Sequence, residues 1–250
     1  RYFIELSYNG KNYHGWQVQP NAITVQEVLT KALSTILRFD IALVGAGRTD
    51  AGVHARQLYA HFDSDKTIDE DYLTKKINAF LPDDIVVKNI FSVRDDSHAR
   101  FDATSRSYEY RIWLGRNPFL LDTTWQLYQK KLDVEMMNEA ATVLLNYTNF
   151  KCFSKTKTDV RTYNCKITEA KWVLKDNDLT FHITADRFLR NMVRAIVGTL
   201  IEVGSGKKTI ENFIKILKSE DRSEAGFSAP PQGLFLTEVK YATSITKNIT

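Results

Sequence analysis

The two halves of this chain carry the same order of secondary-structure signals, and this repeated order constrains the fold more than any other feature. Alternating apolar residues indicate strands, whereas apolar residues spaced three and four apart indicate helices. In the first half, these patterns predict a strand at 2–8, a helix at 25–37, strands at 41–44 and 58–62, a helix at 69–80 and a strand at 85–93.

The second half repeats this order. Its patterns predict a strand at 105–114, a helix at 133–147, strands at 167–174 and 179–185, a helix at 188–203 and a strand at 233–241. An additional helix at 210–218 is the one clear insertion. Each half is therefore a β-α-β-β-α-β unit, the split β-α-β arrangement that ferredoxin-like and RNA-recognition domains use.

The fold class that follows is α+β. We predict that the two β-α-β-β-α-β halves form a mixed, mainly antiparallel sheet with helices packed on it and a central cleft. The domain boundary is expected near Thr104. The first domain, 1–104, would carry a glycine-rich loop with an aspartate. The second domain, 105–250, would carry a strand rich in Tyr and Arg and a basic helix.

Composition limits the classes of function. With 43% hydrophobic and 26% charged residues, the 250-residue chain is globular rather than disordered. A net charge of +4 is too small for nucleic-acid binding by charge alone, so a polyanion site must be local. Two cysteines and no apolar span of membrane length predict a cytoplasmic protein with no membrane association. The scattered histidines predict no metal.

The first candidate site is the loop GAGRTDAGVHA at residues 45–55. Three glycines let the loop bend sharply, and it is far longer than the two residues that would close a hairpin. It carries Arg48, Thr49, Asp50 and His54, a combination that favours a catalytic or binding site. On the loop alone, a capping Asp and a solvated Arg are an equally good interpretation.

The second candidate site is the strand predicted at 105–114. Alternation places Arg106, Tyr108 and Tyr110 on one face, which offers a guanidinium for phosphate and flat rings for stacking on a base. The alternative is a half-buried strand whose tyrosines pack in the core. His14 and Trp16 lie before the first helix as either core or contact residues, and the sequence does not decide between the two.

The third candidate site is the basic side of the helix at 188–203. Arg187, Arg190 and Arg194 lie three and four residues apart, so a helix would let all three address one anion. A solvated face is the alternative for Arg187 and Arg190. Arg194 borders the apolar stripe, where a carboxylate partner could draw it inward. Further cations that suit a phosphate backbone lie in the polar loop at 151–161, namely Lys155, Lys157 and Arg161.

Together, these motifs resemble the tRNA pseudouridine synthases of the TruA family, over nearly the whole chain. The residues that carry the resemblance are 8–17 (YNGKNYHGWQ), 45–55, 78–85 (NAFLPDDI), 98–101 (HARF), Arg106 with Tyr108, 188–194 (FLRNMVR) and 233–236 (GLFL). One departure is Asn149, where family members often carry an acidic residue. That departure concerns a local loop contact and leaves the catalytic set intact.

The resemblance implies a role for each candidate residue. Asp50 is the expected catalytic aspartate, Arg48 the residue that helps turn the target uridine out of the stem, Tyr108 the stacking platform and Arg194 the partner of Asp50. It also implies a tRNA substrate modified at uridines 38, 39 and 40 of the anticodon stem-loop, and a homodimer. The reaction is an isomerisation that needs no cofactor.

Two other functions compete with this interpretation. A non-catalytic RNA-binding protein of two RNA-recognition-like units would explain the fold and the Arg and Tyr strand, but it leaves Asp50 unexplained, because a carboxylate among arginines weakens phosphate binding. A metal-dependent phosphodiesterase using Asp50 with Asp63 or Asp102 lacks a convincing ligand cluster in the sequence.

Overall fold

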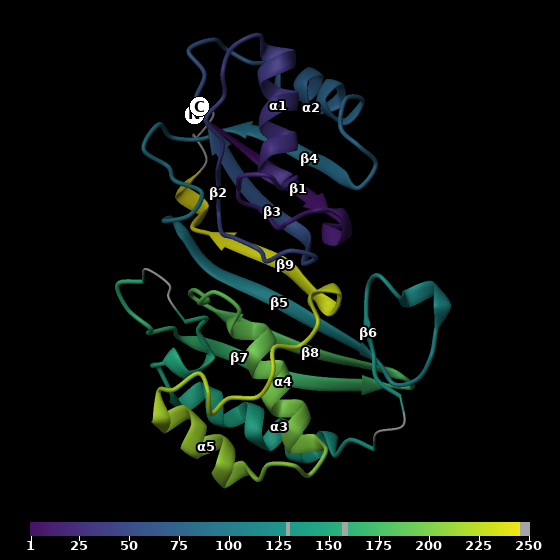
Figure 1. The fold of residues 1–250 in the computed structure, drawn as a ribbon. Coiled ribbons are helices and arrows are strands. Elements are labelled where there is room, and N and C mark those ends of the chain that lie inside the picture. Colours follow the sequence, from purple (N-terminus) through teal and green to yellow (C-terminus); the bar gives the residue numbers. More distant parts are fainter. Residues whose placement is uncertain (129–130, 157–159, 246–250) are drawn as a thin grey trace. The chain divides into compact units, whose positions relative to one another are not determined.

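A computed structural model describes residues 1–128, 131–156 and 160–245 of the chain (Figure 1). The described residues form two compact units. The first contains Arg1–Ser105 and the segment that begins at Leu236, and the second contains Arg106–Phe235. The division into independent domains at residue 104 stays a prediction.

The first unit contains the β-α-β-β-α-β order that its sequence predicts. Its elements are β1 (Tyr2–Tyr8), α1 (Val25–Leu37), β2 (Val44–Gly45), β3 (His54–Phe62), α2 (Glu70–Asn78), β4 (Ile85–Ser92) and most of β9 (Leu234–Tyr241). The strands lie in the order β4-β1-β3-β9, and β2 pairs with β3. Strand β1 is antiparallel to both neighbours, β3 and β4.

Helix α1 begins where the sequence places a capping residue. The Thr24 hydroxyl accepts a hydrogen bond from the Glu27 amide, and Arg38, which follows the last helical residue, has a left-handed backbone. Its buried face consists of Val25, Leu29, Ala32 and Leu33. Helix α2 lies beside α1 (Figure 1). Among the described residues, no helix is both long enough and apolar enough to cross a membrane.

The strand expected at 41–44 is shortened to Val44–Gly45, and this part of the prediction is wrong. Ile41 and Leu43 are buried, as an apolar run suggests, but side chains of α1 bond their backbone groups. The Ile41 amide donates to the Ser34 hydroxyl at 3.0 Å, and the Leu43 carbonyl accepts from the Gln26 amide group at 2.7 Å. Bonds to a helix therefore replace a strand ladder here.

The second unit repeats the order as far as its second helix, whereas the strand predicted to close it, β9, lies mostly in the first unit. Its elements are β5 (Ala103–Trp113, whose first residues belong to the first unit), β6 (Trp125–Gln126), α3 (Val134–Val143), β7 (Ile167–Lys175), β8 (Asp178–Ala185), α4 (Met192–Gly204) and α5 (Ile210–Ser219). Strand β8 lies between β5 and β7 and is antiparallel to both, whereas β6 is parallel to β5. The α+β class and the mixed, mainly antiparallel pairing are thus confirmed.

Helix α4 begins at Met192, not at Phe188 as the periodicity of FLRNMVR predicts. Asn191 has a positive φ of 67° and so interrupts the helical backbone. Arg187 and Arg190 therefore precede the helix, and the prediction that they share its basic side with Arg194 is wrong.

His61 provides a pH-dependent contribution to the stability of the first unit. Its ring is buried, packs against Phe3 and His98, and accepts a hydrogen bond from the Ala99 amide at Nδ1. Burial, assisted by the charge of Arg1, lowers the pKa of His61 from 6.5 to about 4. The unfolded chain therefore takes up this proton at a higher pH than the folded chain.

We expect the free energy of unfolding to fall as the pH drops from the unfolded pKa of about 6.5 towards 4, by up to roughly 3 kcal/mol from this group. Urea unfolding of the wild type and His61→Gln across this range measures the contribution. The Gln side chain can still accept from Ala99, so the variant should lose less stability on acidification. Parallel pH curves would contradict this assignment.

Candidate active site

The loop that carries Asp50 joins β2 to β3 and is closed at both ends by backbone hydrogen bonds. Next to β2, the Ala46 amide donates to the Tyr59 carbonyl at 2.7 Å. Before β3, the Val53 amide donates to the Asp50 carbonyl at 3.2 Å, and Gly52 has a positive φ of 76°. This tight turn fixes the backbone of Asp50, so its side chain emerges at a defined point.

The segment at residues 10–16 holds this loop from a second side. The Trp16 amide donates to the Thr49 carbonyl at 3.3 Å, and the Gly52 amide donates to the Tyr13 carbonyl at 3.2 Å. The Gly10 amide donates to Nδ1 of the buried His54 at 3.0 Å. His54 is therefore a structural residue of the loop, which the sequence alone did not reveal.

Side-chain contacts on either side of Asp50 also fix the loop at residues 45–55. The Tyr8 and Thr49 hydroxyls hydrogen-bond at 2.8 Å. Trp16 is buried against Gly45, where an added Cβ would lie 2.4 Å from the indole Nε1. Trp16 is thus a core residue, whereas His14 is exposed, which answers the question that the sequence left open.

The two charged residues of the loop differ in exposure. Arg48 is exposed, and Asp50 is half-buried. A half-buried carboxylate on a rigid turn can meet a reacting atom without a change in the backbone. An exposed guanidinium on the same turn can reach an incoming polyanion. Both features suit a catalytic loop better than a capping Asp with a solvated Arg, because no helix begins at Asp50.

The second unit presents Tyr108 on β5. Its ring is half-buried and lies nearly perpendicular to the ring of Phe188, with 5.1 Å between centroids and 87° between planes. Tyr110, two residues further on, is fully buried, and its hydroxyl donates to the Pro230 carbonyl at 2.7 Å. Tyr110 is therefore core, and only Tyr108 remains available as a stacking platform. Arg106 donates to the Asp186 carbonyl at 2.7 Å.

Arg194 is held at the first turn of α4. Its Nε donates to the Ala229 carbonyl at 2.6 Å, and the Ala229 amide donates to the Arg194 carbonyl at 2.9 Å. The side chain is half-buried, in agreement with its predicted place at the border of the apolar stripe. Arg194 also carries interactions other than these two.

The remaining predicted cations lie in two loops, one between β8 and α4 and one between α3 and β7. Arg187 is half-buried and Arg190 is exposed. The Asp186 carboxylate accepts from the Arg187 amide at 2.7 Å and so fixes the start of this segment. Lys155 and Arg161 are exposed, whereas Lys157 lies outside the described residues.

Asp63 and Asp102, the partners that a metal-dependent phosphodiesterase would need, bind other residues of the first unit. The Asp63 carboxylate binds the Arg1 guanidinium, with N–O distances of 2.8 and 2.9 Å. The Asp102 carboxylate accepts from the His98 amide at 2.7 Å. Within the described ranges, no cluster of three or more His, Cys, Asp or Glu residues could hold a metal ion.

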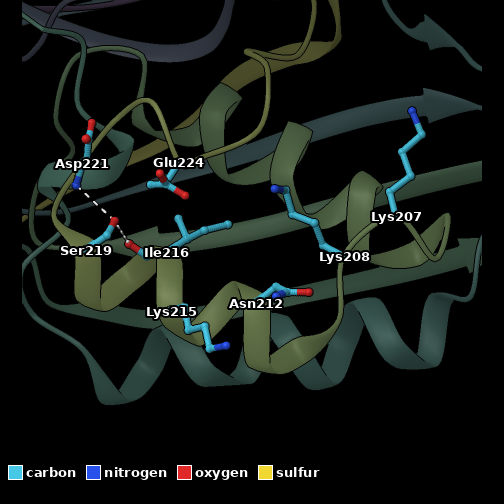
Figure 2. Close-up of a pocket in the computed structure, with 8 residues that line it drawn as sticks. All are labelled: Lys207, Lys208, Asn212, Lys215, Ile216, Ser219, Asp221 and Glu224. Carbon is cyan, nitrogen blue, oxygen red and sulfur yellow. Dashed lines mark hydrogen bonds between the residues drawn. The ribbon is translucent and has the colours of Figure 1, made fainter.

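A hollow of about 530 Å³ on the surface of α5 contains none of the predicted site residues (Figure 2). It is lined by Lys207, Lys208, Asn212, Lys215, Ile216, Ser219, Asp221 and Glu224. The three lysine amino groups point in different directions, and two carboxylates share the hollow (Figure 2). This geometry does not form an anion site.

The comparison with known proteins assigns the chain to a class. A family model described as tRNA pseudouridine synthase matches residues 6–102 and 140–242. Both matched ranges include predicted site residues, Arg48 and Asp50 in the first and Arg194 in the second. The chain belongs to the tRNA pseudouridine synthase family, whose enzymes are isomerases.

Individual relatives carry the narrower name tRNA pseudouridine synthase A. The chain is 52% identical to that of Bacteroides thetaiotaomicron, over 98% of this chain and 92% of the relative. It is 51% identical to that of Porphyromonas gingivalis, over 98% of both chains. It is 42% identical to that of Thermoanaerobacter pseudethanolicus, over 95% of this chain and 98% of the relative.

Two glycines of the loop, Gly45 and Gly47, differ in the space that surrounds them. We expect Gly45→Ala to lower the free energy of unfolding by about 1–3 kcal/mol or more, because the new methyl group overlaps Trp16. Gly47 has no neighbour within 4 Å of an added Cβ and no positive φ. Gly47→Ala should therefore be neutral or stabilising, by up to about 1 kcal/mol. Chemical unfolding of both variants measures the contrast, and equal losses would contradict it.

Proposed function

We propose that this protein isomerises uridine to pseudouridine in tRNA, with Asp50 as the catalytic residue. The observation that carries the proposal is the family match, which includes the rigid loop that presents Asp50 as a half-buried carboxylate. A non-catalytic RNA-binding protein would have no use for a carboxylate held in this way beside an exposed arginine.

The reaction exchanges one glycosidic bond for another within the same nucleoside. The bond between N1 and C1′ breaks, the uracil turns while still bound, and C5 bonds to C1′ before the C5 proton leaves. One carboxylate can serve in three ways: it can add to C1′ of the sugar, add to C6 of the base, or remove a sugar proton to form a glycal. Asp50 must be ionised in each of them.

Arg48 and Tyr108 would bring the base to the carboxylate. A uridine within a stem must be extruded first, at a cost of a few kcal/mol. The exposed Arg48 can occupy the space that the base leaves. Tyr108, in contact with the ring of Phe188, can stack on the extruded uracil and contribute roughly 1–3 kcal/mol. Arg194 would balance the charge of Asp50.

The finer assignments rest on the motif resemblance. We propose that the targets are uridines 38, 39 and 40 of the tRNA anticodon stem-loop, that the enzyme is a homodimer, and that it acts in the cytoplasm without a cofactor. The two domains, 1–104 and 105–250, would contribute Asp50 with Arg48 and Tyr108 with Arg194, respectively.

Asp50→Asn tests the central claim. The amide is nearly the same size but carries no negative charge, so we expect tRNA binding to persist and pseudouridine formation to cease. Unmodified tRNA is incubated with each variant and pseudouridine is mapped along the anticodon arm. Asp65→Asn, at an exposed position, is the matched control and should retain full activity.

Unchanged activity in Asp50→Asn would remove this residue from the mechanism. Absence of pseudouridine with the wild type itself, while tRNA still binds, would favour the non-catalytic RNA-binding protein.

Tyr108→Phe separates stacking from proton transfer. If the phenol only stacks, the variant retains full turnover, because the ring is unchanged. If the phenol also accepts the C5 proton, turnover falls while tRNA affinity holds. We expect Tyr108→Ala to lose activity in either case, by roughly 1–3 kcal/mol in transition-state stabilisation. Single-turnover rates with tRNA distinguish these outcomes, and wild-type activity in Tyr108→Ala would exclude both roles.

A further inference from the structure

Residues 226–230 lie directly on the first turns of α4 (Figure 1). We call these residues the 226–230 segment. The Gly226 amide donates to the Thr199 hydroxyl at 2.9 Å. An added Cβ on Gly198 would lie 1.8 Å from the Phe227 carbonyl oxygen, so the segment touches the helix without intervening side chains. Small movements of this segment must therefore be transmitted to α4.

The 226–230 segment also sets the orientation of Arg194. The Arg194 Nε–H, which donates to the Ala229 carbonyl at 2.6 Å, lies in the plane of the guanidinium. The direction of this bond is therefore one of the contacts that set where the outer nitrogens point. A shift of the Ala229 carbonyl would turn the whole planar group.

Arg222 holds the residues just before Ala229. Its guanidinium donates to the Gly226 carbonyl and to the Ser228 hydroxyl, both at 3.0 Å. The Ser228 hydroxyl also accepts from the Asn191 side chain at 2.7 Å. Arg222 thus closes the loop from 222 to 228, and Ser228 joins that loop to the residue before α4.

The bonds of Arg222 require an arginine. A planar guanidinium presents several N–H groups in fixed directions, so one side chain can bind a carbonyl and a hydroxyl two residues apart. A lysine has the same charge but no such fork, and it cannot hold both acceptors in the same geometry.

We propose that Arg222 is a positioning residue for the isomerisation, acting through Ser228 and Ala229 on the guanidinium of Arg194. The proposal rests on the function proposed above, in which Arg194 balances Asp50. Arg222 itself need not touch the tRNA. Arg222 keeps the Ala229 carbonyl in place. The hydrogen bond from Arg194 Nε to that carbonyl then holds the guanidinium in the orientation that the reaction needs.

Arg222→Lys is the decisive variant, because it preserves charge and removes the fork. A misplaced group of this kind can cost up to about 100-fold in rate, and we expect kcat to fall about 10- to 100-fold with KM unchanged. Lys218→Arg, an exchange of the same two residue types at an exposed position of α5, is the control and should match the wild type. Steady-state kcat and KM are measured below the melting temperature of each variant, with enzyme concentrations corrected for the folded fraction.

Ser228→Ala provides a second test with a smaller change to the fold. We expect kcat to fall with KM unchanged, as for Arg222→Lys. The double variant Arg222→Lys/Ser228→Ala should be little slower than the slower single variant, because both changes break the same chain of contacts. If Arg222→Lys does not fold, Ser228→Ala alone decides. A kcat equal to that of the wild type per folded molecule in either variant would overturn the proposal, as would fully additive losses.

Arg194→Lys keeps this test separate from the test of the proposed function. Slow turnover in Arg194→Lys with normal turnover in Arg222→Lys would overturn the positioning role alone. Normal turnover in Arg194→Lys would remove Arg194 from the proposed function and, with it, the basis of the positioning role.

Discussion

Close backbone contact between residues 10–16 and the loop at residues 45–55 is the constraint on which the candidate site of the first unit depends. An added Cβ would lie 2.2 Å from the Thr49 carbonyl at Gly15 and 2.0 Å from the Val53 carbonyl at Gly10. No side chain fits between the two segments at these points. The approach lets amides of one segment bond carbonyls of the other on both sides of Asp50. The carboxylate can then project from a turn whose geometry is fixed before any substrate arrives.

Glycines also permit a close backbone contact in the second unit. Gly198 and Gly226 permit α4 and the 226–230 segment to meet at van der Waals distance, and Ala229 bonds both the backbone and the side chain of Arg194. The neighbouring Pro230 carbonyl receives the hydroxyl of Tyr110, which lies on the same strand as Tyr108. One short segment is therefore bonded to both elements that carry the predicted substrate-binding residues of this unit.

Periodicity predicted the order of the elements because it reports which side chains are buried, and burial follows the sheet and helix faces closely. It failed where backbone groups bond to something other than a neighbouring strand or turn. Ile41 and Leu43 are as buried as strand residues, but α1 binds their backbone. The residues before Met192 have helical spacing, but the left-handed Asn191 interrupts the backbone, an outcome that hydrophobic patterning cannot register.

Asp50, Arg48, Tyr108 and Arg194 were predicted as site residues from the sequence, because each belongs to a motif of unusual composition, and their roles stay predictions. The contacts of Trp16, His54 and Arg222 were not predicted, since they are made with backbone atoms, a hydroxyl or a glycine, which leave no pattern in a single sequence. Residues that meet a substrate must have a particular functional group, whereas residues that hold a backbone need only fit one local geometry. The contacts that position a site are therefore harder to predict from the sequence than the groups that act in it, and the structure adds most at these contacts.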